Sequence, residues 1–178
     1  MIVNLFKSSK AHRQLKISLK SHINRKLDIG EILSREYSDS VVIDAYEYCM
    51  RKCGWSPYTL EAGNIRDFLL CVLFEGEIDN GGVAQFISNS SGDMVEETVF
   101  ALEKIGEPKT ARMLREILRC FPNGVVPKDC DARNALMEQF DEGVEAQFDK
   151  FDRSLWEHSL LQSCYTFLQS HKNDFLCF

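Results

Sequence analysis

The chain has 178 residues, of which 44% are hydrophobic and 27% charged, and its formal net charge is −6. That length and composition fit one globular domain, and no stretch approaches the roughly 20 apolar residues that a membrane helix needs. The seven cysteines are odd in number and scattered, and the first ten residues lack the apolar core of a secretory signal, so we expect reduced thiols, a cytoplasmic location and no membrane association.

The charge is distributed unevenly along the chain. Residues 1–27 contain seven bases and no acid, which leaves 14 bases against all 27 acids in residues 28–178, a charge of −13. In the first segment an apolar residue recurs every four positions, at Leu15, Leu19, Ile23 and Leu27. We therefore predict a basic N-terminal arm or first helix over 1–27, followed by a single helical domain over 28–178.

An apolar period typical of helices begins after the arm. Residues 41–52 form an amphipathic pattern that ends near Gly54, and residues 64–75 include an unbroken apolar run from Phe68 to Phe74. This run predicts a helix buried on most sides. After the Asn-Gly-Gly break at residues 80–82, apolar residues at 83, 86 and 87 predict a short helix with one buried side.

The Asn-Gly-Gly break allows two interpretations. Its glycines permit positive φ between two helices, and Asn80 is placed to cap the short helix with its side-chain oxygen. Alternatively, exposed amides at a helix N-terminus would hold an anion or a peptide carboxylate, with the side-chain amides of Gln85 and Asn89 on the same side of the helix. From the residues alone the structural interpretation is favoured.

The clearest local signals predict a central helical hairpin. Asp93 and Glu96 have the spacing of a capping box, an apolar face continues to Ile105, Gly106 is placed to end that helix and Pro108 to start the next. Further apolar periods predict helices over 132–140, ending near Gly143, over 144–151 and over 155–168. We therefore expect an all-α fold: a single-domain bundle of about seven or eight helices with a central antiparallel hairpin.

The C-terminal third is rich in acids. On one continuous helix, the six between residues 138 and 152 would form a line of negative charge, although Gly143 makes that continuity doubtful. A row of carboxylates can imitate the phosphate spacing of nucleic acid and attract basic DNA-binding surfaces, whereas the simpler alternative is a solvated helix face. The candidate acidic interaction face consists of Asp129, Asp131, Glu138, Asp141, Glu142, Glu145, Asp149 and Asp152.

Neither a metal site nor a catalytic constellation emerges from the motifs. Cys49 and Cys53 share a helix face, but no second Cys or His pair accompanies them. His158 and Cys164 are six residues apart and point to different helix faces, so only a meeting in space would make a nucleophile and its base. We therefore expect a protein without enzymatic activity, cofactor or metal.

The segment from Glu77 to Gly92 resembles the signature of a bacterial DNA-mimic protein family, a widespread domain family of mostly unknown function. The residues that carry the resemblance are Asn80, Gly81, Gly82, Gln85, Phe86, Asn89, Ser90, Ser91 and Gly92. The resemblance implies an all-α fold, a homodimer as one arrangement, and an acidic surface that binds a DNA-binding regulator. It leaves open whether the signature residues are structural or also form a binding groove.

One preferred function and two alternatives follow. The first is a regulatory domain whose acidic face binds another protein with a basic surface, such as a DNA-binding regulator, without direct binding of nucleic acid by the body. The alternatives are a small-molecule or peptide-binding domain that uses the region from Asn80 to Asn89, and an immunity-type protein.

Overall fold

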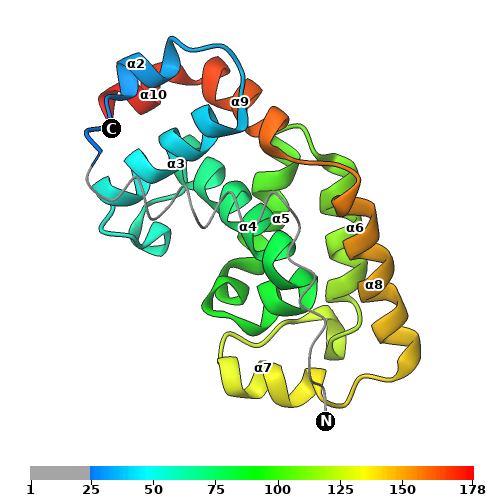
Figure 1. Cartoon of the computed structure of the whole chain (residues 1–178). Coiled ribbons are helices and arrows are strands. Elements are labelled where there is room, and N and C mark those ends of the chain that lie inside the picture. Colours follow the sequence, from blue (N-terminus) through cyan, green and yellow to red (C-terminus); the bar gives the residue numbers. More distant parts are fainter. Residues whose placement is uncertain (1–24) are drawn as a thin grey trace.

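The computed structural model describes residues 25–178, and within this range the chain is all-α (Figure 1). The predicted fold class is confirmed. This part of the chain forms nine α-helices, more than expected because α2 and α10 have only five and six residues. The helices are α2 (Ile29–Leu33), α3 (Asp39–Lys52), α4 (Asn64–Ser88), α5 (Val95–Lys104), α6 (Pro108–Leu118), α7 (Cys130–Met137), α8 (Glu142–Trp156), α9 (Leu161–Ser170) and α10 (Lys172–Cys177). The 3₁₀ turns are η1 (Pro57–Thr59), η2 (Ser90–Met94) and η3 (Pro122–Gly124).

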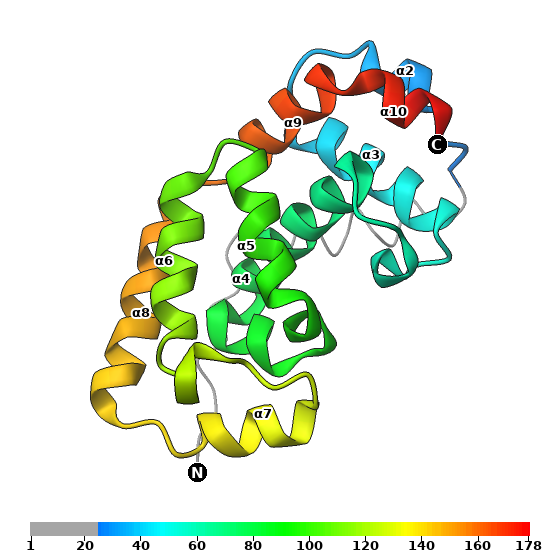
Figure 2. The same ribbon diagram turned by 180° about the vertical axis from the view of Figure 1, so that it is seen from behind.

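Helix α4 passes through the middle of the molecule. It contacts α3, α5, α7, α8, α9 and α10, and its residues 68–72 are all buried, as the apolar run predicts. Helices α2, α3, α9 and α10 gather at one end of the molecule, whereas α5 to α8 form the other end (Figure 1). Figure 2 shows the same division from behind. The burial of α4 on most sides explains why its sequence is apolar without a clear polar stripe.

The predicted helical hairpin is confirmed by α5 and α6, which contact each other along their length. Gly106 adopts φ 93°, which ends α5, and Pro108 occupies the first turn of α6, where its missing N–H costs nothing. The amide of Glu107 donates to the carbonyl of Leu102 at 2.8 Å and closes the turn.

Three predicted boundaries are wrong. The helix expected over 155–168 is divided, because α8 continues to Trp156 and α9 begins only at Leu161. The helix expected over 64–75 continues as far as the glycine break, because α4 extends to Ser88 with non-helical angles only at Gly81 and Gly82. The helix expected to end near Gly143 ends instead at Met137, and Gly143 lies in the first turn of α8. The reason is Asp141, whose carboxylate accepts from the amides of Gly143 and Val144 at 3.0 Å and thereby begins α8.

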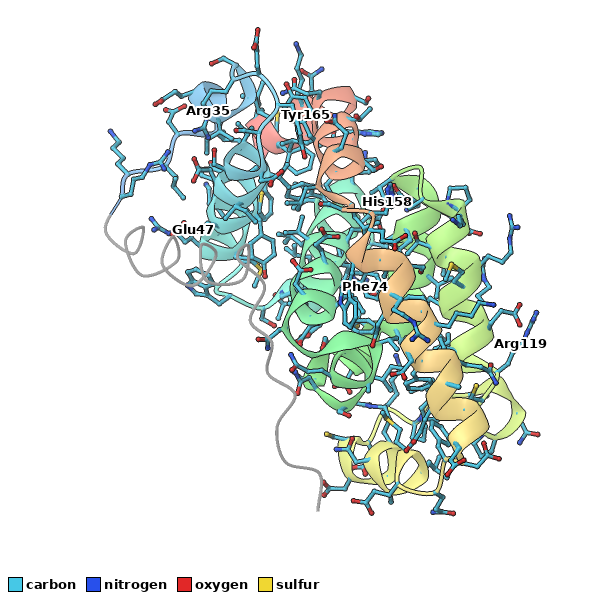
Figure 3. All side chains as sticks on the ribbon, turned by 45° about the vertical axis from the view of Figure 1, so that its right-hand side comes forward. Arg35, Glu47, Phe74, Arg119, His158 and Tyr165 are labelled. Atoms are coloured by element: carbon cyan, nitrogen blue, oxygen red, sulfur yellow. The ribbon has the colours of Figure 1, made fainter. Side chains whose placement is uncertain are left out.

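Aromatic side chains fill the space between α4 and α8. Phe74 lies edge-to-face with Phe86 at a ring separation of 4.8 Å and with Phe151 at 6.3 Å, and all three are buried. Figure 3 shows Phe74 between these two helices. Because Phe86 comes from beyond the glycine break, this cluster fixes the direction in which α4 continues after it.

The described chain begins at Arg25, on the surface of α3. Its guanidinium donates to both carboxylate oxygens of Asp44, at 2.8 and 3.3 Å, and its carbonyl accepts from Arg51 at 2.9 Å. Arg35 donates to the same carboxylate at 2.7 Å. The predicted basic arm over 1–27, apart from its last three residues, lies outside the described residues.

Candidate functional site

The glycine break in α4 is closed by a side chain from α8. Gly82 adopts φ 78°, and a carboxylate oxygen of Asp152 accepts from the amide of Val83 at 2.8 Å. A Cβ at Gly82 would lie well under 3.0 Å from that carboxylate, so the close approach requires glycine. The prediction that Asn80 caps the short helix is wrong, because the cap comes from Asp152, which packing of α8 places over the break.

Three side chains of the signature converge on one carboxylate. Glu77 accepts from the amide groups of Gln85 at 2.7 Å and Asn89 at 2.9 Å, and from the hydroxyl of Ser91 at 3.1 Å. Glu77 precedes the break and the three donors follow it, so these bonds hold the two parts of α4 and η2 in a fixed arrangement. The amides on which a ligand site between Asn80 and Asn89 would rely therefore bond within the protein.

The Asn-Ser-Ser-Gly turn of the signature, together with Asp93 that follows it, wraps around a buried arginine. Arg133, on α7, has 0% of its surface exposed, and its charge is paired with Asp93 at 2.9 Å. Its remaining hydrogen bonds go to four backbone carbonyl oxygens, those of Ile87 at 2.6 Å, Asn89 at 2.8 Å, Pro127 at 2.7 Å and Lys128 at 3.1 Å.

The capping box predicted from Asp93 and Glu96 is wrong. Helix α5 begins without a side-chain cap, because the carboxylate of Asp93 bonds to Arg133 instead. Gly92 lies against this arginine, and a Cβ there would fall well under 3.0 Å from the carbonyl of Ile87. The third glycine of the signature therefore permits a close approach of two backbone segments.

The predicted acids occupy two helices and not one. Glu138 to Asp141 form the turn between α7 and α8, so the continuous line of charge expected over 138–152 does not exist. The acids are distributed over both helices, from Asp129 at the start of α7 to Asp152 in the second half of α8, and these two helices form the corner of the molecule at the opposite end from α3 (Figure 1). Seven of the eight are exposed, Asp152 is half-buried, and none is ion-paired within residues 25–178.

Some of these acids stabilise the helices on which they lie. Asp129 accepts from the amide of Ala132 and begins α7, as Asp141 begins α8. Glu142 and Glu145 lie in the first turn of α8, where negative charge is favourable to the helix dipole. Glu138 and Asp149 have no such role, so their exposed charge is not explained by helix formation.

Burial of Arg133 makes this corner more acidic than the sequence suggests. Residues 129–157 contain nine acids and only three bases, Arg133, Lys150 and Arg153. Because Arg133 is buried and paired with Asp93, only Lys150 and Arg153 remain exposed on these helices.

Residues 60–171 match the model of one family, described as DMP19-like protein. The chain belongs to the DMP19-like family. Neither the curated proteins nor the solved structures contain a match to it. The match contains the whole signature, α7 and α8, whereas residues 25–59, with α2 and α3, lie outside it.

The three buried thiols of this DMP19-like chain, Cys49, Cys71 and Cys164, are not activated. Burial raises the pKa of Cys49 to about 12 and also raises the pKa of Cys71 and of Cys164, so these thiols stay protonated, in contrast to an activated nucleophile. His158 bonds to Glu107, at 3.1 and 3.2 Å. In residues 25–178 no three potential ligand side chains gather as a metal site, and no helix is long and apolar enough to cross a membrane.

The Asp152 cap gives the DMP19-like fold a testable pH dependence. Partial burial raises the pKa of Asp152 from 3.8 to about 6, so the folded protein binds this proton more tightly than the unfolded chain. The resulting stability is present below about pH 4 and is lost as the pH rises through 6. Asp152→Asn keeps an oxygen acceptor and removes the charge. After discounting for solvent, we expect the free energy of unfolding of the variant minus that of wild type to be larger, by up to about 1 kcal/mol, at pH 7.5 than at pH 5, because only wild type loses the contribution of Asp152 between these pH values.

Urea unfolding of both proteins at the two pH values measures this difference. Burial also raises the pKa of Glu75 to about 6, and its carboxylate accepts from Ser159 and from the amide of Leu160. Because Glu75 is still present in the variant, the stability of the variant should also decrease as the pH rises, but less than that of wild type. A stability difference between variant and wild type that does not change with pH would contradict the assignment.

Proposed function

We propose that this chain is a non-enzymatic protein-interaction protein whose acidic corner binds the basic surface of a DNA-binding protein. The acidic corner is defined as the seven exposed acids Asp129, Asp131, Glu138, Asp141, Glu142, Glu145 and Asp149. Membership of the DMP19-like family, a family of DNA mimics, supports the proposal.

The observation that carries the proposal is that the negative charges of the acidic corner have no positive partners in the described part of the chain. None of the seven carboxylates is ion-paired within residues 25–178, and the one arginine of α7 faces inward. Uncompensated charge of one sign produces a field that attracts an oppositely charged partner and increases its association rate. Surfaces that bind duplex DNA are basic, so they are the surfaces that this field fits.

Neutralising three acids of the corner tests the proposal. The variant Glu138→Gln/Glu145→Gln/Asp149→Asn changes exposed side chains that cap no helix. A partner captured from the native host should be a DNA-binding protein, and we expect it to bind this variant about 10- to 100-fold more weakly, since each exposed pair contributes about 0.5–1 kcal/mol. Binding should also weaken steeply between 0.1 and 0.5 M salt, as is expected for screened charges.

The matched control is Glu36→Gln/Glu61→Gln/Glu96→Gln, which removes the same charge from exposed positions on other elements. Its affinity should remain within about threefold of wild type, since none of these positions belongs to the acidic corner. Duplex DNA should compete with the protein for the captured partner. A partner that tolerates the first variant, or that binds this protein and DNA together, would contradict the proposal.

A further inference from the structure

Helix α8 carries an exposed tryptophan on the same stripe as its acids. At 3.6 residues per turn, Glu142, Glu145, Asp149, Asp152 and Trp156 lie within an arc of about 80°. Phe151 lies on the opposite side of the helix and Phe148 about 40° from Asp152, and both are buried in the core. Glu142, Glu145, Asp149 and Trp156 of this stripe are exposed, whereas Asp152 is half-buried against the glycine break of α4.

Trp156 is the most exposed large hydrophobic side chain in residues 25–178, with 65% of its surface accessible. In the described chain Trp156 takes part in no aromatic pair. The cation–π pairs there are those of Lys52 with Tyr48 and of Arg115 with Phe100, so none involves Trp156. The indole therefore presents its ring to solvent without a described cation over it. A tryptophan contributes much less to stability in that position than it would in the core.

The surroundings of Trp156 favour a cation. It is the last residue of α8, and the C-terminal end of a 15-residue helix carries partial negative charge. Asp149 and Asp152 precede it by about two turns and one turn, and Glu157 follows it directly. The helix end and the exposed carboxylates of Asp149 and Glu157 favour a cation on the ring face, and the one lysine or arginine within a turn of Trp156 is the exposed Arg153, which no cation–π contact joins to the ring.

We propose that Trp156 binds an arginine of the basic partner, with the guanidinium over the indole and the neighbouring bases of the same segment on Glu145 and Asp149. This inference rests on the proposed function and names one contact within it. Arginine is favoured over lysine because its planar guanidinium stacks on an aromatic face and loses less hydration. Tryptophan and arginine are also the side chains most enriched at the centres of protein interfaces.

The chain contains two tryptophans, which supplies a matched control. Trp55 is 56% exposed and lies between α3 and η1, away from the acidic stripe. Trp55→Phe leaves Trp156 as the single tryptophan, and Trp156→Phe leaves Trp55. When a nine-residue arginine peptide is titrated into each variant at about 0.1 M salt, we expect the fluorescence of Trp156 to change and that of Trp55 to stay constant.

Affinities of the same peptide complete the test. Trp156→Ala should weaken binding of the arginine peptide about 3- to 10-fold, and binding of a nine-residue lysine peptide by less. Trp55→Ala should leave both unchanged. Equal effects of the two alanine variants, or an unresponsive Trp156, would overturn the inference. If the triple variant of the acidic corner also binds the arginine peptide as wild type does, the proposed function fails as well; if that variant loses binding while Trp156→Ala does not, only the role of Trp156 is lost.

Discussion

Arg133→Ala is expected to destabilise this protein more than any change on its surface. The substitution leaves Asp93 without its cation and four carbonyl oxygens without their donor, in a place where the arginine has no exposed surface. Because Asp93 is itself 45% exposed, the lost ion pair counts for less than a fully buried one, and it is the four carbonyl oxygens left without a donor that bring the expected cost to about 3–5 kcal/mol. For a chain of this size the midpoint of thermal unfolding should fall by about 10 °C.

The control for this prediction is Arg153→Ala. Arg153 is exposed on α8 and takes part in no ion pair within residues 25–178, so its loss should change the free energy of unfolding by less than about 0.5 kcal/mol. Arg133→Lys should fall between the two, because a lysine keeps the charge but cannot reach five acceptors at once. If thermal and urea unfolding give similar values for the variants at 133 and 153, Arg133 does not hold the signature turn.

Gly92→Ala is expected to have the second largest effect. The added methyl group would meet the carbonyl of Ile87 and the guanidinium of Arg133, neither of which can move away without losing the hydrogen bond between them. Together the steric conflict and the disturbed arginine should cost about 2–4 kcal/mol. The measurement is again the midpoint of urea unfolding.

Gly76→Ala provides the opposite expectation for the same chemical change. Gly76 lies inside α4, and a methyl group there meets nothing within 4 Å. Alanine favours a helix over glycine by up to about 1 kcal/mol, so this variant should be as stable as wild type or slightly more stable. Equal destabilisation by both substitutions would show that the space at Gly92 is not the reason for its glycine.

The fold could be predicted where signals lie within one or two turns of the chain. Gly106 and Pro108 mark the end of α5 and the start of α6 by their own backbone preferences, which do not depend on distant residues. The wrong prediction of a helix end near Gly143 also comes from a local signal. A glycine can also sit in a helix, and only the cap from Asp141 decides that α8 starts before it.

The candidate site could be predicted only in part, because its hydrogen bonds join distant residues. The sequence indicates that the Asn-Gly-Gly break requires special backbone angles, and Gly82 has them. It does not show that Asp152, 69 positions later, accepts from Val83, or that Glu77 takes the donors of Gln85 and Asn89. An acid close in sequence to side-chain amides indicates that the two can pair, but several acids lie near the break, and the sequence does not show which of them accepts.

The sequence by itself therefore predicts the all-helical fold that residues 25–178 adopt, and it also shows an excess of acids and a signature built around glycines. It does so because hydrophobic period, glycine and proline act locally, and because charge can be counted without a structure. Only the tertiary structure decides which charges remain at the surface. Packing of α7 buries Arg133 in the signature and packing of α8 places Asp152 on the glycine break, so the remaining acids are left exposed at the corner between those helices.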